Sequence, residues 1–445
     1  MKQYDSYKDS GVEWIGKIPS HWESMPLKRY GKFNKGLSFT KADLISEGKP
    51  VVSYGQVHSK LNKGTSLRNE LIRFVPDSIA NSEASLVKKG DFIFADTSED
   101  LDGSGNVVYN DTSDNVYGGY HTVLFQTKNN DNKYLAYLFT TDCWRSQIRS
   151  RVGGVKVYSI TQYILGLSSI ILPPLAEQKN IALYLDEQTS RIDNIIYARE
   201  NKIKLLEELR TAIISKAVTK GIRKNVEFKD SGIEWIGRIP KHWEKCPLKW
   251  LVKRIGSGKT PLGGAEVYTS EGIMFIRSQN VYNEGLLTEN IAYIPEIIHR
   301  QMLYSEVKHN DILLNITGGS IGRACLIQDG AIKANVNQHV CEIRPIVEKI
   351  YPQFLHYTII SSHIQNEIRA CQTGGNRDEL NFEQISNFII PLPPIDEQIK
   401  ICSLIFGELQ RISKMFKECN DEIALLKEYR SSLITEVVTG KRKVI

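Results

Sequence analysis

The residues that most often carry out chemistry occur in this sequence without the spacing that a reaction requires. The tract from Gly256 to Pro261, GSGKTP, resembles the end of a phosphate-binding loop, but such a loop has a glycine six residues before its lysine, and Lys253 occupies that position. No GxGxxG motif opens a helix after a strand, and the nine histidines show no HExxH or other metal-binding spacing. We therefore expect neither a catalytic residue nor a metal site.

Two further enzyme classes are disfavoured by what is missing around particular residues. The Leu-Pro-Pro tripeptides that begin at Leu172 and Leu392 lack the acidic or amide residue that adenine methyltransferases place before two prolines. Asp77 has no carboxylate-x-lysine partner at a distance suited to a nuclease. The seven cysteines include no CxxC pair, so we expect buried thiols rather than disulfides or a metal cluster.

The elements that organise the chain are two related long helices. The tract 173–221 returns as 393–440. Each copy opens with two prolines, which suit a first helical turn, and closes near a glycine that can adopt the left-handed cap conformation. Each copy is predicted to form one helix of about 45 residues, about 68 Å long.

Apolar side chains recur along both helices at alternating steps of three and four residues, which is the pattern of a coiled-coil seam. Thr189, Arg199 and Arg210 interrupt the first seam. Arg210 and Arg430 occupy equivalent positions, so a parallel pair would bring two guanidinium groups together, and we expect an antiparallel pair. The predicted seam consists of Leu185, Ile192, Ile196, Ile203, Leu206, Ile213, Ile405, Leu409, Ile412, Phe416, Ile423, Leu426 and Leu433.

The repeat extends beyond the helices, because Tyr7 to Leu27 matches Phe228 to Leu248. The chain is therefore one unit of about 220 residues written twice. We predict a first domain over 1–172, a central helix over 173–221, a second domain over 222–392 and a terminal helix over 393–445. Within the shared segment, tryptophans and histidines are interpreted as core rather than ligand-binding residues: Trp14, Trp22, Trp235, Trp243, His21 and His242.

An acid and an amide, Glu177-Gln178 and Glu397-Gln398, recur at the start of both helices. An acidic side chain in a first turn stabilises the helix dipole, which is the simpler explanation, and a contact with a partner protein is the other.

Between the shared segments and the helices, short β-like runs alternate with glycine and asparagine, and helical stretches follow near 132–148 and 350–368. Some landmarks recur in both middles, including Thr97 and Thr317, and His121 and His339. The fold class is predicted to be α+β, with two similar α/β domains separated by two long helices packed as an antiparallel coiled coil, in a pseudo-twofold internal repeat. Domains that share a scaffold but differ in their loops would suit two different ligands.

The composition places the chain among soluble proteins with two or three domains. It has 445 residues, of which 41% are hydrophobic and 24% charged, and a net charge of +6. The first residues lack the layout of a secretory signal, and no stretch approaches the roughly 18 to 20 apolar residues of a membrane span. We expect no membrane association and a cytoplasmic location.

Taken in order, these features resemble the specificity subunit of type I restriction-modification enzymes over essentially the whole chain. The resemblance is carried by the segments around Trp14 and Trp235, by the Gly-Lys-Thr-Pro tract at 258–261, and by the Leu-Pro-Pro-x-x-Glu-Gln sequence that opens each helix. It implies two target recognition domains, each reading one half of a bipartite, asymmetric sequence in double-stranded DNA. Divergent loops on a shared framework agree with such a function.

The resemblance also implies the partners of the chain. The paired helices would set the spacer between the two half-sites and dock two adenine-methyltransferase modification subunits, which bind S-adenosylmethionine. Motor-nuclease restriction subunits, which use ATP and Mg²⁺, would join through that assembly. The chain itself would be non-catalytic and would bind no cofactor.

Candidate DNA contacts follow from the side chains that read base edges and phosphates, which are Arg, Lys, Asn, Gln, Ser and Thr on loops. In the first domain the candidates are Lys35, Ser38, Gln56, His58, Lys60, Tyr120, His121, Arg151 and Lys156. In the second they are Lys259, Thr260, Arg277, Gln279, Asn280, Arg323, Gln338, His339 and Arg377. The glutamines and histidines are equally plausible as braces of their loops.

Two other functions stay open on the sequence alone. One is an interaction scaffold without DNA specificity, in which the coiled coil mediates association. The other is a methyltransferase fragment with a degenerate site, which the missing motifs disfavour.

Overall fold

The computed structural model describes residues 3–129, 131–154, 156–223, 225–372 and 379–444. The chain forms two compact units, of which the first is built from two stretches of sequence and the second from one. The first unit is Met1–Arg199 with Asp421–Ile445, and the second is Glu200–Asn420. Among the described residues, no helix combines the length and apolar character that crossing a membrane requires.

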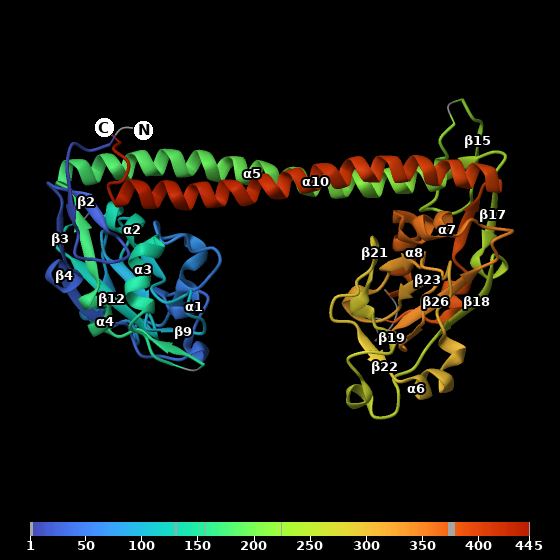
Figure 1. Cartoon of the computed structure of the whole chain (residues 1–445), viewed down its shortest axis with the longest axis horizontal. Helices are drawn as coiled ribbons and strands as arrows, with labels where there is room; N and C mark the ends of the chain where they lie inside the picture. Colours follow the sequence, from blue (N-terminus) through green and yellow to red (C-terminus); the bar gives the residue numbers. More distant parts are fainter. Residues whose placement is uncertain (1–2, 130, 155, 224, 373–378, 445) are drawn as a thin grey trace. The chain divides into compact units, whose positions relative to one another are not determined.

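Two long helices contribute to both units, α5 (Leu175–Lys220) and α10 (Ile395–Val438). Each begins directly after its pair of prolines, as predicted. Gly221 and Gly440 follow the two helices in the left-handed conformation, both with φ of +70°, so the predicted glycine caps are confirmed. Figure 1 shows α5 and α10 side by side as two continuous helices.

The two helices run antiparallel within each unit. In the first unit Arg430 pairs with Asp193 at 3.2 Å, and Glu422, earlier on α10, pairs with Arg199, later on α5, at 2.7 Å. In the second unit Gly221, just after α5, lies against Glu397 in the first turn of α10. Only antiparallel packing produces both arrangements, so the predicted direction of the pair is confirmed.

Most of the predicted seam is buried, although the buried face shifts in the last third of α5. Ile203 and Ile213 are half-buried, whereas Ile214 and Val218 are buried at 3% and 0% exposure. Arg210 does not enter the seam but forms an ion pair with Glu284 of its own unit. The seam residues buried below a tenth exposed are Leu185, Ile192, Ile196, Leu206, Ile405, Ile412, Ile423 and Leu433.

The globular part of the first unit contains two four-stranded sheets. The order of one is β10-β8-β12-β4, with all its pairs antiparallel, and the order of the other is β6-β5-β11-β7, in which β5 and β11 are parallel. The strands are β4 (Gly31–Lys35), β5 (Lys49–Val52), β6 (Arg73–Val75), β7 (Leu86–Val87), β8 (Phe92–Ala95), β10 (Val107–Tyr109), β11 (Val116–Gly118) and β12 (Thr122–Thr127).

The second unit repeats this topology, except that its second sheet has three strands and, among the described residues, no strand in the place of β7. Its sheets have the orders β18-β26-β23-β24 and β22-β19-β25, and β19 and β25 are again the parallel pair. The strands are β18 (Val252–Ser257), β19 (Ile273–Ile276), β22 (Ala292–Ile294), β23 (Ile312–Asn315), β24 (Ala324–Leu326), β25 (Ala334–Val336) and β26 (Val340–Pro345). The internal repeat predicted from the sequence is therefore a repeat of strand order as well.

Short helices cover the sheets in both units. In the first unit they are α1 (Tyr54–Val57), α2 (Lys133–Thr140), α3 (Asp142–Arg149) and α4 (Gln162–Leu167), and in the second α6 (Glu296–Gln301), α7 (Pro352–Ile360), α8 (Ser362–Gln372) and α9 (Phe382–Ser386). Four of them, α2, α3, α7 and α8, confirm the helical stretches predicted near 132–148 and 350–368, and the other four were not predicted.

The repeated tryptophan segment joins each globular part to the helices. It folds as β1 (Tyr7–Asp9) with β2 (Lys17–Pro19) in the first unit, and as β15 (Phe228–Asp230) with β16 (Arg238–Pro240) in the second. Trp22 and Trp243 are completely buried, but Trp14 and Trp235 are 40% and 39% exposed. The prediction of a core position is therefore confirmed for only one tryptophan of each copy.

The acid at the start of each long helix braces this segment. Glu177 contacts His21 Nε2 at 2.9 Å and accepts a hydrogen bond from Trp22 Nε1 at 3.3 Å, while Glu397 contacts His242 Nε2 at 2.9 Å. The recurring amides donate to the first proline carbonyl of their own helix at 2.8 Å. The Glu-Gln pairs thus hold the helix starts within their units.

Candidate nucleic-acid interface

Four strands of the second unit end beside one another and form a surface that we call the second corner. It consists of Gly258–Thr260 after β18, Arg277 after β19, Thr317 after β23 and Asn337–His339 after β25. Three backbone hydrogen bonds join these strand ends, from Gly258 N to Asn337 O, from Asn337 N to Ile276 O and from Ile316 N to His339 O. The contact at Gly258 is so close that a Cβ atom there would lie 1.7 Å from Val336 O, so only glycine fits.

A chain of side-chain contacts runs across the second corner. Thr317 Oγ1 lies 2.7 Å from His339 Nδ1, and His339 Nε2 lies 3.1 Å from Gln338 Nε2. Gln338 Oε1 accepts a hydrogen bond from Thr260 Oγ1 at 2.6 Å. The predicted contact residues Thr260, Gln338 and His339 are therefore linked by direct contacts, although up to 79 positions separate them. The exposed Lys259 lies next to Thr260.

The first unit builds the same corner from different residues. The first corner consists of Gly36–Phe39, Tyr54, Asp96 and Tyr120–His121. Asp96 N donates to His121 O, as Ile316 N does to His339 O in the second unit, and Gly36 N donates to Thr122 O. A Cβ atom at Gly36 would lie 2.0 Å from Gly119 O, so this position has the same requirement for glycine as Gly258.

A surface pocket of about 770 Å³ opens at the first corner. Four predicted contact residues, Lys35, Ser38, Tyr120 and His121, are among the residues that line it. The ring of Tyr120 packs edge-to-face on Phe39 with centroids 5.1 Å apart, and it also packs on Tyr54 and His121. The pocket combines a cation, a hydroxyl and aromatic faces, which can bind phosphates and bases, with the carboxylate of Asp96, which lies 3.3 Å from His121 Nδ1.

The other candidates in the first unit lie outside this pocket. Gln56 caps α1 by accepting from Ser53 N at 3.2 Å, and His58 is held between Thr97 O and Asn106, so both are braces. Arg151 donates to the carbonyl of Gln147 at 2.5 Å and is otherwise exposed. Lys60 and Lys156 are exposed.

His58 also lines a separate pocket of about 490 Å³, whose lining includes Glu99, Asp100 and Asp102. Three carboxylates repel a polyanion, so this pocket does not suit DNA phosphates. Among the described residues, no three His, Cys, Asp or Glu side chains are placed to hold a metal ion.

The remaining candidates of the second unit separate into braces and surface residues. Asn280 is only 1% exposed and its side chain bonds Arg277 N and Leu287 O, so it braces its turn and cannot contact a ligand. The guanidinium groups of Arg277 and Arg323 lie over the rings of Tyr268 and Tyr282, at 5.5 and 5.0 Å. Gln279 is exposed. Arg377 lies outside the described residues.

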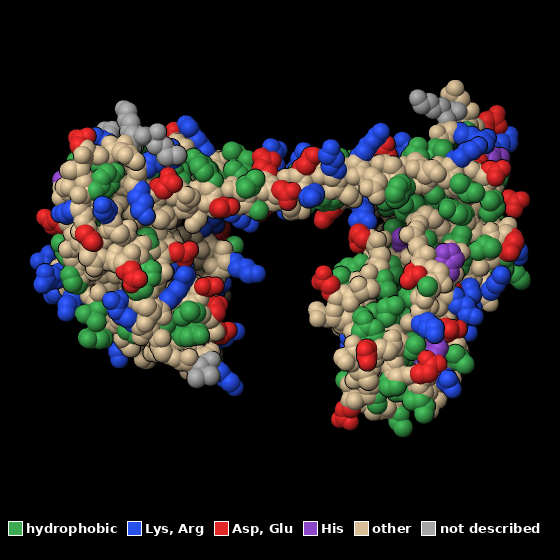
Figure 2. Space-filling view, in the orientation of Figure 1, with side chains coloured by type: hydrophobic (Ala, Val, Ile, Leu, Met, Phe, Trp, Pro, Cys, Tyr) green, Lys and Arg blue, Asp and Glu red, His purple; other side chains and the backbone are tan. Residues whose placement is uncertain are grey.

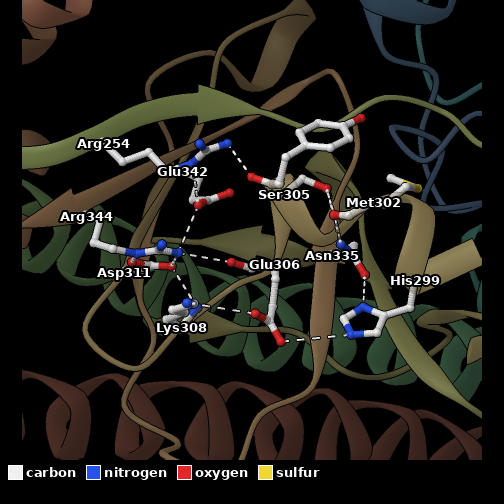
Figure 3. A network of polar contacts seen from close by, with 11 residues as sticks. Arg254, His299, Met302, Ser305, Glu306, Lys308, Asp311, Asn335, Glu342 and Arg344 are labelled. Atoms are coloured by element: carbon white, nitrogen blue, oxygen red, sulfur yellow. Dashed lines mark hydrogen bonds and ion pairs between the residues drawn. The ribbon is translucent and has the colours of Figure 1, made fainter.

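A buried charge network supports the second unit (Figure 3). Arg254 Nε and Arg344 Nη2 lie 2.8 and 2.9 Å from Glu342 Oε1, and Arg344 also pairs with Asp311 at 2.8 Å. Glu342 and Asp311 have no exposed side-chain surface. Burial raises the pKa of Glu342 to about 7, against the effect of the two arginines. The network ties β18, β23 and β26 together and, through Arg254 and Arg344, holds the backbone of Tyr304 and Glu306.

Sequence reasoning missed several residues of the two corners. Gly36 and Gly258 could have been found by aligning the two copies, because each follows a β-like run at the same place in the repeat. Phe39 and Tyr54 gave no signal, since an isolated aromatic residue outside a repeated pattern is not distinguished by its neighbours in sequence.

Comparison with known proteins identifies the family. The family described as "Type I restriction modification DNA specificity domain" matches the chain twice, over residues 19–205 and 240–419. The type I restriction enzyme MjaVIII specificity subunit of Methanocaldococcus jannaschii is 27% identical over 328 residues, which are 72% of this chain and 73% of that protein. The EcoKI specificity subunit of Escherichia coli K12 is 21% identical over 440 residues, which are 96% of this chain and 90% of that protein.

A solved structure has a similar fold. It comes from work titled as the structural basis of complex assembly and conformational transition of the type I R-M system. It superposes with a TM-score of 0.70 at 16% identity, over 95% of this chain and 98% of that one. Because the two family matches together span well over half of the sequence, this chain belongs to the type I restriction-modification DNA specificity family, and it carries the specificity domain twice.

Proposed function

We propose that the chain reads two separate tracts of double-stranded DNA, one with each corner, as the specificity subunit of a type I restriction-modification assembly. The observation that carries this proposal is the repetition of one corner on the same strand ends with different side chains. A conserved framework with exchanged loop residues is what reading two unlike half-sites requires. An interaction scaffold without DNA specificity is disfavoured, since both halves match a DNA specificity domain.

The contacts would divide between phosphates and base edges. Lys35 and Lys259 are exposed cations beside the two corners and would contact phosphates, as would Lys60, Arg151 and Lys156. Base edges would be contacted by Ser38, Tyr120 and His121 in the first unit, and by Gln279 and Gln338 in the second, where Thr260 and His339 hold the amide of Gln338. Arg277 and Arg323 are further candidates, because stacking on a tyrosine leaves the edge of a guanidinium free to donate.

The long helices would dock the partner subunits. Large apolar side chains on α5 and α10 are exposed, which leaves apolar surface uncovered (Figure 2). Two adenine-methylating modification subunits that bind S-adenosylmethionine would cover this surface, and restriction subunits using ATP and Mg²⁺ would join them. The exposed residues include Leu183, Ile195, Tyr197, Leu205, Leu209, Leu404, Phe406, Leu425 and Tyr429.

In this proposal the domain limits are 1–172 and 222–392 for the two readers, with the helices at 173–221 and 393–445. The distance between the readers would set the length of the unread spacer. The subunit would act in the cytoplasm, where cellular DNA is accessible.

Selection from a randomised duplex library tests the proposal. The full chain, assembled with its modification subunits, is expected to enrich one bipartite sequence with a fixed spacer. Substituting Lys35 and Lys259 with Ala should lower the affinity for all sequences and flatten the salt dependence by roughly one charge per lysine. Enrichment of no sequence, or of a single uninterrupted one, would contradict it.

A further inference from the structure

We infer that Gln338 reads an adenine in the half-site bound by the second unit, and that Thr260 and His339 hold its amide in position to do so. The inference rests on the proposed function and names one base and the residue that selects it. Its basis is the hydrogen-bonding capacity that the second corner leaves unused.

Gln338 is exposed, yet its amide is held on two sides. Its oxygen accepts from the hydroxyl of Thr260 at 2.6 Å, and its nitrogen lies 3.1 Å from Nε2 of His339. His339 is in turn fixed by Thr317, whose hydroxyl lies 2.7 Å from Nδ1. A long exposed side chain is ordinarily free to change rotamer, and ordering it costs free energy on binding. Here the contacts with Thr260 and His339 already order the Gln338 side chain before a ligand binds.

The proton arrangement of this chain is constrained by the groups in it. An amide nitrogen can only donate, so His339 Nε2 accepts and its proton lies on Nδ1, which donates to Thr317. If the amide of Gln338 were turned over, its nitrogen would donate to Thr260 Oγ1. Its oxygen would then accept from His339, whose proton would have to lie on Nε2. Both arrangements are complete, and in both one donor and one acceptor of the amide are used within the protein.

The unused groups are therefore one N–H and one oxygen lone pair on the same amide. A primary amide has two of each, and each brace consumes one. In the major groove adenine presents an acceptor, N7, next to a donor, the N6 amino group, and a glutamine amide pairs with both at once. Guanine presents two acceptors there, so it cannot satisfy the free oxygen of Gln338.

The counterpart in the first unit has different chemistry. Tyr120 precedes His121 as Gln338 precedes His339, and both histidine carbonyls accept the same backbone hydrogen bond from the strand end opposite. Tyr120 has a single hydroxyl and its ring is packed against Phe39. It cannot offer a paired donor and acceptor on one planar group, so we expect the adenine reader in the second unit alone.

Library selection with the assembled complex tests this inference at one base pair. Wild type should prefer adenine at one position of one half-site. Gln338→Ala should reduce that preference by about 5- to 150-fold, which is the usual discrimination of a bidentate contact, and should leave the other positions of both half-sites unchanged. Gln338→Glu, which can only accept, should shift the preference towards cytosine, whose amino group donates.

His339→Ala separates positioning from contact. It should weaken the preference at the same position, because the amide is then free to turn over, while the rest of the selected sequence persists. Gln328→Ala provides the matched control, since Gln328 is an exposed glutamine of the same unit that bonds only Gln353 among the described side chains. It should change nothing.

The outcomes distinguish the inference from the proposed function. A wild-type complex that selects no sequence would refute both. A wild-type complex that selects a bipartite sequence, with Gln338→Ala and Gln338→Glu both retaining every preference, would refute the adenine reader alone. An equal loss of base preference at all positions of the half-site would also refute it, because such a loss would indicate that Gln338 has a structural role. If Gln338→Ala fails to fold, Gln338→Met preserves the length of the side chain and carries the same expectation.

Discussion

At the scale of single residues, the two units differ at one buried position of the central sheet. Glu342 on β26 pairs with Leu313 on β23, and Leu124 on β12 pairs with Ile93 on β8. Glu342 and Leu124 therefore occupy equivalent positions in the two units. Glu367 on α8 is also half-buried with its pKa raised to about 7 by burial. The second unit thus contains carboxyl groups that bind protons more tightly when folded than when unfolded.

This difference predicts a pH dependence of stability. The pKa of Glu342 rises from about 4.5 to about 7 on folding, so the folded second unit retains a proton that the unfolded chain releases. The free energy of unfolding should fall as pH rises from about 4.5 to about 7, by up to about 3 kcal/mol. Glu342→Gln should flatten this profile in chemical denaturation, whereas Glu348→Gln, at an exposed position of the same unit, should leave it steep. Identical profiles for wild type and Glu342→Gln would contradict the assignment.

Substitution of Glu397 tests whether this acid stabilises the start of α10 through its hydrogen bond or through the helix dipole. Its side chain is 4% exposed and contacts the partly exposed His242, so Glu397→Ala removes a hydrogen bond made by a buried carboxylate and should cost about 1–3 kcal/mol. Asp396 occupies the same first turn of α10 but is exposed, and Asp396→Ala removes only the favourable dipole interaction, worth about 0.3–1 kcal/mol. Equal losses of unfolding free energy would favour the dipole explanation.

At the scale of elements, the corners depend on strand ends that approach too closely for a side chain. The Cβ atom of Gly258→Ala would overlap Val336 O, so β18 and β25 must separate. We expect a loss of about 1–3 kcal/mol in unfolding free energy, together with loss of preference for the half-site of the second unit. Gly330→Ala is the control, because a Cβ atom there meets nothing within 4 Å. If the Gly258→Ala variant selected the same DNA sequence as wild type, the second corner would not be the surface that reads the half-site.

The exposed face of the long helices is proposed to bind the modification subunits, whereas their seam holds the two helices together. Leu425 is 65% exposed and Tyr429 is 50% exposed on the same face of α10, one helical turn apart. Leu425→Asp with Tyr429→Asp should lower recovery of the modification subunits in co-purification by at least tenfold, with the unfolding midpoint unchanged. Ile297→Asp, at a 69% exposed position on α6, is the control. Full recovery with the helix variant would contradict docking on this face.

At the scale of the whole molecule, the chain is one architecture written twice with different details. Strand order, the glycine in each corner, the glutamate brace and the buried tryptophan recur in both units. The groups at the surface of the corners, Tyr120 and Gln338, and the buried Leu124 and Glu342 do not. The two units therefore share a framework and differ in the side chains that it presents.

The sequence by itself determined the features that depend on near neighbours. Double prolines and glycines mark the ends of α5 and α10, heptad spacing predicts their pairing, and the repeat predicts two related units. The order of the repeated segments indicated the family, which the two matches to the specificity domain confirm. Each of these signals acts within a few residues or by comparison of the two copies.

Only the tertiary structure decided which loop residues meet. Thr260, Thr317, Gln338 and His339 are separated by dozens of positions, and they converge because β19 pairs with β25 in parallel while β18 and β23 flank β26. Long-range packing also buries Asn280 and leaves Trp14 exposed, although the sequence pattern treats these residues like their neighbours. Strand pairing is a property of the whole chain, because it depends on which distant apolar faces are buried together, and no local pattern of residues specifies it.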